Sequence, residues 1–239
     1  MRAKLPTAAR YRAIAARPPL IRPRAGPQPP SPKGEGIPKS ARDHIHRHVE
    51  DLGNLQNRVD VVAGGGGHVV GGAGLAVCDC LRRAKVDVKL VSIMGRKMVT
   101  GSHGFKIEAD CLFEEIGDDA DVLFLPGGLV GTNNLKAHRG LAEMLKAHAA
   151  AGKRLAAICA APSVLGELGL VEGHRATCYP GFENQMKGAD CRGDGVVTDR
   201  LISTGRGMGW AIDLGLELIR ILVSENEAEK IRKAIQYER

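Results

Sequence analysis

Short apolar runs alternate with helical repeats along the chain from residue 59 onward. Apolar runs of strand length recur at residues 59–63, 86–94, 120–125 and 154–158. Apolar positions spaced three and four apart predict helices at residues 75–84, 135–150, 208–222 and 226–236. Strands that alternate with helices of this length form right-handed βαβ units. We therefore predict an α/β fold in which helices cover both faces of a mostly parallel sheet.

Shorter segments are expected to add further strands. Residues 98–100 and 105–107 flank a Gly-Ser-His-Gly turn and should pair as a hairpin. Three short strands are predicted at residues 176–179, 196–197 and 201–202, the last two joined by a turn around Asp199 and Arg200. No internal repeat is visible, so we expect one α/β domain over residues 59–239.

Residues 1–58 lack any sustained hydrophobic period. Nine of the twelve prolines lie at or before Pro38, and the segment is rich in Arg and poor in aromatic residues. Such a composition cannot bury enough apolar surface to order itself, so we predict a disordered extension. Two alternatives remain open. The segment could be an organelle transit peptide, although it is rich in Pro and poor in Ser, or upstream sequence foreign to the natural protein.

The net charge of +7 belongs to this N-terminal segment. Residues 1–34 hold eight Lys or Arg residues and no acidic residue, which leaves 26 basic and 27 acidic residues in the rest of the chain. A nucleic-acid-binding surface needs positive charge clustered on the folded part. We therefore expect no nucleic-acid partner.

The apolar runs and the cysteines bear on the compartment. No run approaches the roughly 18 apolar residues that span a bilayer, and no secretory signal is recognisable, so we expect a cytoplasmic protein without a membrane partner. Organelle import through the Arg-rich N-terminus is a minor alternative. Six cysteines should then be reduced thiols: Cys78, Cys80, Cys111, Cys159, Cys178 and Cys191. The Cys-x-Cys pair at residues 78–80 has no second pair at zinc-ligand spacing, so we expect no metal.

Cys159 is the candidate reactive residue. It lies between the predicted strand 154–158 and a helical pattern that begins at Ala161, with Pro162 in its first turn. A side chain at such a turn projects from the carboxyl edge of the sheet, where α/β proteins place their ligands. The helix N-terminus should favour thiolate over thiol. On this local pattern alone, a buried structural cysteine is an equally good interpretation.

The sequence around Cys159 resembles the nucleophile-elbow region of the DJ-1/PfpI family. The resemblance rests on four motifs, at residues 125–128 (LPGG), 156–170 (AAICAAPSVLGELGL), 173–183 (GHRATCYPGFE) and 203–219 (STGRGMGWAIDLGLELI). It covers about residues 75–237. It implies a flavodoxin-like three-layer α/β sandwich, a homodimer, and an oxidisable cysteine nucleophile at Cys159 that needs neither cofactor nor metal.

The resemblance also assigns backbone groups around the nucleophile. A thiolate that attacks a carbonyl needs donors for the oxyanion that forms, and the family position of these donors corresponds to the N–H groups of Gly128 and Ala160. Gly127 has no Cβ and would allow their close approach. Without the resemblance, a plain tight turn at Gly127 and Gly128 is the less favoured alternative.

Three side chains receive supporting roles from the same resemblance. Tyr179 occupies a position where the family often has His, and Tyr is found there in bacterial-type relatives. Arg206 matches a family arginine beside the site that could hold an anion or the dimer partner, with an ordinary surface ion pair as the alternative. His103 matches a polar position that faces the dimer interface.

Two family features are missing. Protease-like members carry His directly after the cysteine, and Ala160 at that position argues against a Cys-His peptidase. The DJ-1-like branch keeps a Glu near the start of the first helix, and the corresponding residue is Ala73. Alanine can neither donate a proton to the sulfur nor shuttle one.

The stretch at residues 63–74 (AGGGGHVVGGAG) departs from the family while its flanks agree. A compensated reading-frame slip would give such a block. A phosphate-binding glycine loop is the rival interpretation, but the stretch contains neither G-x-G-x-x-G nor G-x-x-x-x-G-K-[ST]. Nucleotide binding is therefore disfavoured.

Three functions remain open. The resemblance implies a thiol enzyme that acts on a small carbonyl substrate, such as a glyoxalase or deglycase for 2-oxoaldehydes and their adducts. A second hypothesis is a redox-sensing or chaperone-like protein in which Cys159 is oxidised without turnover. The third is an inactive homologue. The missing Glu at Ala73 favours the second and third, and the intact region around Cys159 favours the first.

Overall fold

The structure is a computed structural model that describes residues 57–64, 72–101 and 104–239. The predicted disordered extension lies almost wholly outside the described residues. So do most of the glycine-rich stretch at 63–74 and the turn that contains His103.

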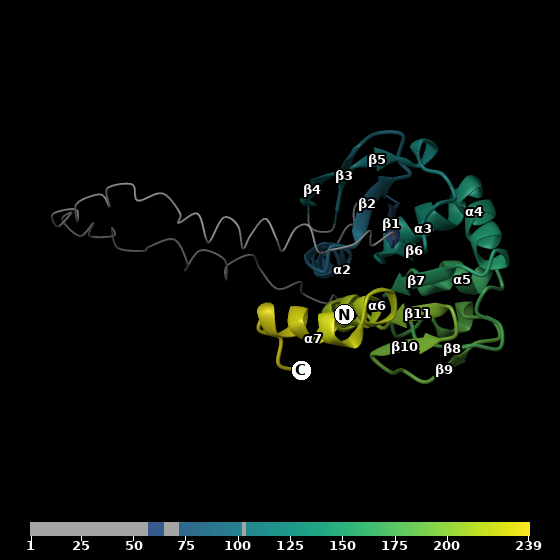
Figure 1. Cartoon of the computed structure of the whole chain (residues 1–239). Coiled ribbons are helices and arrows are strands. Elements are labelled where there is room, and N and C mark those ends of the chain that lie inside the picture. The colour runs from purple at the N-terminus through teal and green to yellow at the C-terminus, as the bar shows by residue number, and fades with distance from the viewer. Residues whose placement is uncertain (1–56, 65–71, 102–103) are drawn as a thin grey trace, which may run out of the picture. The chain divides into compact units, whose positions relative to one another are not determined.

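A seven-stranded sheet forms the centre of the fold, in the order β10-β11-β7-β6-β1-β2-β5 (Figure 1). Its strands are β1 (Arg58–Ala63), β2 (Asp87–Ser92), β5 (Cys111–Leu112), β6 (Val122–Leu125), β7 (Arg154–Ile158), β10 (Val196–Asp199) and β11 (Ile202–Gly205). β10 pairs with β11 antiparallel, and every other pairing in this sheet is parallel. The predicted α/β class with a mostly parallel sheet is confirmed.

β1 shows why the strands read as continuous apolar runs. Val59, Val61 and Ala63 enter one hydrophobic cluster, whereas Val62 enters another. Because side chains alternate along a strand, both faces of β1 are buried, as expected for a parallel sheet with helices on each side.

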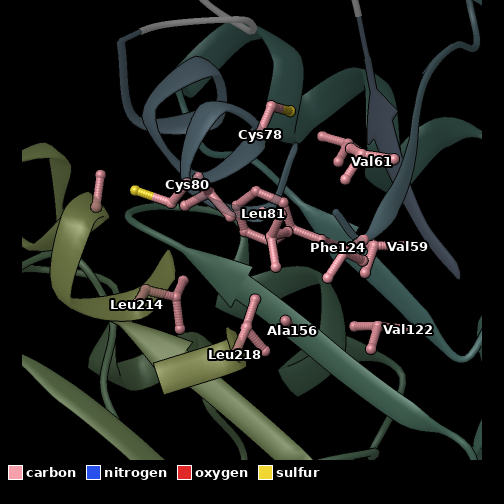
Figure 2. Close-up of a cluster of buried hydrophobic side chains, with 14 of the residues drawn as sticks. Val59, Val61, Cys78, Cys80, Leu81, Val122, Phe124, Ala156, Leu214 and Leu218 are labelled. Carbon is pink, nitrogen blue, oxygen red and sulfur yellow. The ribbon is translucent and has the colours of Figure 1, made fainter. Parts of the chain in front are cut away.

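Helices α2 (Gly72–Arg83), α6 (Ala211–Leu222) and α7 (Glu225–Ala234) belong to the layer on one face of the sheet. Figure 2 shows Leu81 of α2 beside Phe124 of the sheet, with Leu214 and Leu218 of α6 facing them. Cys80 of α2 is a core residue in the same cluster. Apolar stripes on these helices thus supply one half of the core.

The opposite face carries α3 (Leu129–Ala137), α4 (Arg139–Ala150) and α5 (Pro162–Glu167). Leu135, Leu141, Leu145 and Leu165 of these helices cluster with Leu123 of β6. The three-layer sandwich predicted from the sequence is therefore confirmed.

Two small sheets flank the central one. β3 (Met98–Thr100) and β4 (Lys106–Glu108) pair as the predicted antiparallel hairpin. β8 (Arg175–Ala176) pairs in parallel with β9 (Asp190–Cys191). The strand predicted at residues 176–179 overlaps β8 only at Ala176, which is a correction. Neither β5 nor β9 was predicted, since two-residue strands carry no period.

The predicted helix at residues 135–150 is in fact two helices, which is a correction. α3 begins directly after Gly128, and His138 separates it from α4. Nδ1 of His138 accepts the Leu141 N–H at 3.0 Å, so His138 caps the second helix. α2 likewise begins at Gly72, three residues before the predicted start.

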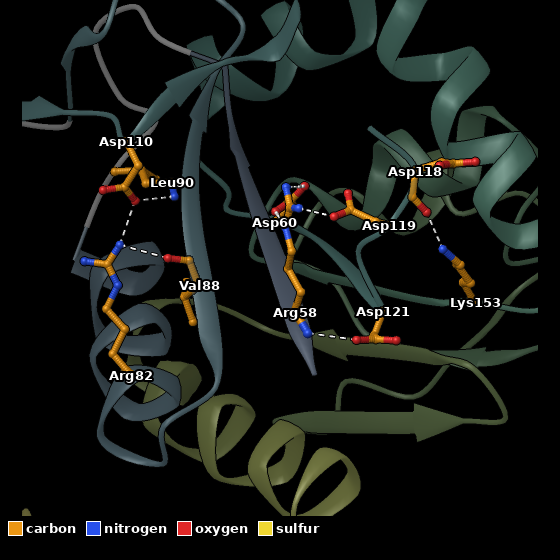
Figure 3. A network of polar contacts seen from close by, with 10 residues as sticks. All are labelled: Arg58, Asp60, Arg82, Val88, Leu90, Asp110, Asp118, Asp119, Asp121 and Lys153. Carbon is orange, nitrogen blue, oxygen red and sulfur yellow. Dashed lines mark hydrogen bonds and ion pairs between the residues drawn. The ribbon is translucent and has the colours of Figure 1, made fainter. Parts of the chain in front are cut away.

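Hydrogen bonds and ion pairs connect the amino ends of β1, β6 and β7, at the edge of the sheet opposite their carboxyl ends (Figure 3). Arg58 at the start of β1 donates its N–H to Asp121 at 2.8 Å and pairs through its guanidinium with Asp60 and Asp119. Lys153, just before β7, donates to the Asp118 carbonyl oxygen. These contacts hold β1, β6 and β7 in register, which fixes the positions of the loops at their other ends.

Candidate functional site

Three neighbouring strands place the candidate site. β11, β7 and β6 are adjacent and parallel, so their carboxyl ends meet at one edge of the sheet. Arg206 follows β11, Cys159 follows β7, and the Pro-Gly-Gly turn at 126–128 follows β6. The structure therefore brings together residues that are about 80 positions apart in the sequence.

Cys159 lies on a sharp turn whose backbone is held at both ends. Its φ of 66° is in the left-handed region, which is costly for a residue with a Cβ. The Cys159 N–H donates to the Gly205 carbonyl oxygen at 2.8 Å, and its own carbonyl oxygen accepts the Tyr179 N–H at 2.8 Å. The surrounding chain thus fixes a strained strand-to-helix turn, the geometry of a nucleophile elbow.

The glycine pair after β6 lies directly against this turn. A Cβ added to Gly127 would be 2.6 Å from the Cys159 Cβ and 2.9 Å from the Ala160 nitrogen, so only glycine fits. Gly128 has a φ of 116°, a conformation that residues with a side chain rarely adopt. Both glycines are therefore required by the site geometry rather than by a plain turn.

The thiol of Cys159 is half-buried and lies within reach of two backbone donors. Burial raises its pKa, and hydrogen bonds from the N–H groups of Ala160 and Gly128 lower it, with burial the larger effect. The backbone N–H groups at the turn therefore favour the thiolate, as expected, but burial opposes them and sets the net direction of the pKa shift. α5 has only six residues, and the free-energy cost of desolvating the thiolate is larger than the stabilisation from the two backbone N–H groups.

Ala73 lies in the first turn of α2 and is buried in the hydrophobic cluster against which Cys159 also packs. Its methyl group offers neither donor nor acceptor. Across the described residues, no side-chain acid or base contributes to the pKa shift of Cys159. The site thus consists of a thiol and backbone N–H groups.

Tyr179 and Arg206 flank the turn. The Tyr179 ring is partly exposed, whereas Arg206 is held by hydrogen bonds to the backbone. The Tyr179 ring is about half exposed, at 49%, and stands edge-on to Phe182. Arg206 donates its N–H to the Gly195 carbonyl oxygen at 2.8 Å and donates from Nη1 to the Gly193 carbonyl oxygen at 2.7 Å. Arg206 thus anchors the loop that precedes β10.

The sequence reasoning missed two contributors. The Gly205 carbonyl oxygen holds the Cys159 N–H, and Met208 is 69% exposed beside the start of α2. A Cβ on Gly72 would lie 2.8 Å from the Met208 Cε, so Met208 lies against the residue that precedes Ala73. The signal for both was their place in the Ser-Thr-Gly-Arg-Gly-Met motif.

The remaining features do not add to this site. A cavity of about 380 Å³ lies at the amino ends of β6 and β7, lined by Leu123, Met144 and His148 among others, away from Cys159. Within residues 57–64, 72–101 and 104–239, no cluster of three or more His, Cys, Asp or Glu side chains is arranged to hold a metal. In the same part of the chain, no helix has the length and apolar character needed to cross a bilayer.

Comparison with known proteins relates this geometry to a family. The DJ-1/PfpI family model matches residues 74–221. Dj-1beta of Drosophila melanogaster is 30% identical over 164 residues, which are 67% of this chain and 88% of that protein. A deglycase of Pyrococcus abyssi is 36% identical over 98 residues, 41% of this chain and 58% of that one.

Solved structures agree with the sequence comparison. The structure of oxidized Toxoplasma gondii DJ-1 superposes with a TM-score of 0.71 at 33% identity, covering 77% of this chain and all of that one. The matched family region contains the strand-to-helix turn at Cys159, the glycine pair after β6 and the arginine after β11. The chain belongs to the DJ-1/PfpI family.

Proposed function

We propose that the chain is a cysteine-dependent enzyme of the glyoxalase or deglycase type, which acts slowly on 2-oxoaldehydes or their adducts. The observation that carries this proposal is the Cys159 sulfur on a strained turn at the carboxyl edge of the sheet, hydrogen-bonded by two backbone N–H groups. A relative from Pyrococcus abyssi that carries the name deglycase supports the substrate class.

The first chemical step is attack of the Cys159 thiolate on the aldehyde carbon. A C–S bond forms, the carbonyl π electrons move to oxygen, and protonation of that oxygen gives a hemithioacetal. The N–H groups of Gly128 and Ala160 stabilise the thiolate before the attack. We assign them also to the oxyanion, which forms on the carbon that becomes bonded to the sulfur.

The low rate follows from the absence of an acid–base side chain at Ala73. General acid–base catalysis contributes about 10²–10⁴ in rate, and Ala73 cannot supply it. The raised pKa of Cys159 adds to the deficit, because less thiolate is present at neutral pH. We therefore propose that the nucleophile Cys159 is intact and that proton transfer in the reaction is impaired.

Methylglyoxal consumption by the full chain tests the proposal. We expect slow turnover that increases with pH and disappears in Cys159→Ala. A Cys111→Ser variant is the matched control, because Cys111 is also a partly exposed thiol and lies at an edge strand away from the site. Equal consumption by the wild type and Cys159→Ala would overturn the proposal.

A redox role of Cys159 is the second candidate. It is favoured by the absence of an acid or base acting on this thiol among the described residues, together with two N–H donors that could hold sulfinate oxygens. Peroxide treatment followed by intact-mass measurement separates the two candidates. Gain of two oxygen atoms at Cys159 in a protein without turnover would favour the redox role.

A further inference from the structure

Two cysteines outside the Cys159 turn lie together at the β8–β9 sheet. β8 and β9 pair in parallel with Ala176 opposite Cys191, and Cys178 follows two residues after Ala176. Side chains two residues apart point to the same side of an extended chain. The Cys178 side chain therefore lies on the same side as Ala176 and Cys191. Figure 1 shows β8 and β9 side by side next to β10.

The two thiols interact with each other. A hydrogen bond between their side chains acts to raise the pKa of Cys178 and to lower that of Cys191, and Cys191 packs against the hydrophobic cluster that contains Cys178. Cys178 is buried, whereas Cys191 is partly exposed. A small oxidant in water can therefore reach Cys191 first, with a second thiol already in place behind it.

We propose that Cys178 and Cys191 form a redox-active dithiol that a hydroperoxide oxidises to a disulfide. First, the Cys191 thiolate attacks one oxygen of the peroxide. An S–O bond forms, the O–O bond breaks, and the other oxygen takes a proton and leaves as an alcohol or water. Next, the deprotonated Cys178 sulfur attacks the resulting sulfenic acid, so that an S–S bond forms and the S–O bond breaks with loss of water. The two thiols lose the two electrons that the peroxide gains.

Burial of the two thiols, together with nearby carboxylates, makes this oxidation slow at neutral pH. Burial raises the pKa of Cys178 to about 12, with Cys191 and Glu183 adding to the shift and Arg206 opposing it. Burial also raises the pKa of Cys191, aided by Glu183 and Asp190 and opposed by the hydrogen bond from Cys178. Because the thiolate is the nucleophile, the rate should increase as the pH rises.

Oxidation of the pair would act on the Cys159 site through short connections. Tyr179 directly follows the buried cysteine, and its N–H donates to the Cys159 carbonyl oxygen at 2.8 Å. On the other side, Nη1 of Arg206 holds the Gly193 carbonyl oxygen at 2.7 Å, two residues after the exposed cysteine. A disulfide would therefore link the segment that carries Tyr179 to the segment that Arg206 holds at Gly193. Its formation does not depend on the proposed enzyme activity.

Peptide mapping of the full chain tests the proposal. Trypsin cleaves after Arg175, Lys187 and Arg192, so the two cysteines fall in separate peptides, residues 176–187 and 188–192. The protein is treated with hydrogen peroxide, remaining thiols are blocked with N-ethylmaleimide, and the digest is analysed without reductant. We expect a linked peptide pair that is lighter than its reduced parts by two hydrogen atoms and separates with dithiothreitol.

Four variants decide the assignment. Cys178→Ser and Cys191→Ser should abolish the linked pair, whereas Cys159→Ala and the matched control Cys111→Ser should retain it. The yield at a fixed time should be greater at pH 9 than at pH 7. Recovery of both peptides unlinked from wild-type protein whose Cys159 has been oxidised would overturn the proposal. A link from either cysteine to the Cys159 peptide would overturn it equally.

Discussion

At Cys159, burial and hydrogen bonding act on the thiol in opposite directions. Burial raises the pKa and outweighs the N–H groups of Ala160 and Gly128, so the neutral thiol persists to higher pH than in an exposed cysteine. The raised pKa means that thiolate accumulates only as the pH increases. The reactivity of Cys159 should therefore be limited by deprotonation in the neutral range.

Alkylation kinetics measure this directly. We expect Cys159 to react with iodoacetamide faster than the other five cysteines, because it is the one whose thiolate is stabilised by the N–H groups of two other residues, Ala160 and Gly128. The rate should still be rising at about pH 9, beyond the ordinary thiol pKa. Peptide-resolved labelling with limiting reagent follows each cysteine. A Cys159 rate that levels off below pH 7 would show a depressed pKa, and faster labelling of Cys111 or Cys191 would contradict the assignment of the nucleophile.

The close approach at Gly127 supports a second prediction at this scale. In Gly127→Ala the new Cβ would meet the Cys159 Cβ at 2.6 Å, so the turn or the glycine pair must shift. We expect the free energy of unfolding to fall by about 1–3 kcal/mol, the usual cost of overpacking, and Cys159 alkylation to slow. Gly209→Ala is the matched control, because its Cβ would point into open space. Urea unfolding of both variants checks the difference, and equal stability would refute the argument.

Among the elements, β1, β2, β6 and β7 were predictable because each is a continuous apolar run, and the longer helices α2, α4 and α6 because of their apolar spacing. The break between α3 and α4 was not, since residues 135–150 keep their apolar spacing across His138. α3 ends where the His138 backbone becomes extended, and the His138 side chain then caps the Leu141 N–H at the start of α4. Its ring also stands edge-on to Phe113, with 4.6 Å between the ring centroids. Such a contact depends on the tertiary fold and leaves no periodic signal.

A substitution at His138 tests whether this cap matters. His138→Ala should lower the free energy of unfolding by about 1 kcal/mol, because the Leu141 N–H loses its acceptor. His138→Asn should recover part of the loss, since asparagine is also a good helix cap. Chemical denaturation of the three proteins gives the comparison. If His138→Ala is as stable as the wild type, the cap contributes nothing.

In the candidate site, too, some features were predictable from the sequence and others depend on the tertiary fold. The order of the motifs allowed Cys159, Gly128 and Ala160 to be placed at one edge of the sheet, because parallel strands end on the same side. The sign of the Cys159 pKa shift could not be predicted, since it depends on how deeply the sulfur is buried. The contact between Cys178 and Cys191 could not be predicted either, because it requires the two-residue strand β9.

For the whole molecule, contacts at residues 57 and 58 join the first described strand to the rest of the fold. The Asn57 side-chain amide donates to the Leu222 carbonyl oxygen at 2.5 Å, and the Arg58 N–H donates to Asp121 at 2.8 Å. Both contacts remain when residues 1–55 are deleted. The homodimer implied by the family resemblance stays a prediction at this scale.

Deletion of residues 1–55 should leave the thermal midpoint within about two degrees of the full chain, because the Pro- and Arg-rich composition predicts no buried surface in that segment. Differential scanning calorimetry of the two proteins under identical conditions provides the measurement. A fall of about ten degrees would show that the segment contributes to the folded structure.

The central claim is that the chain has the nucleophile of its family but lacks the proton-transfer group at Ala73. The most direct test replaces residues 67–73 by an acidic segment of the family type, with Glu at position 73, and measures methylglyoxal turnover. We expect at least about a tenfold increase, the low end of what general acid–base catalysis contributes, and complete loss when Cys159→Ala is added. Turnover by the unmodified chain that already equals that of the replaced variant would contradict the claim.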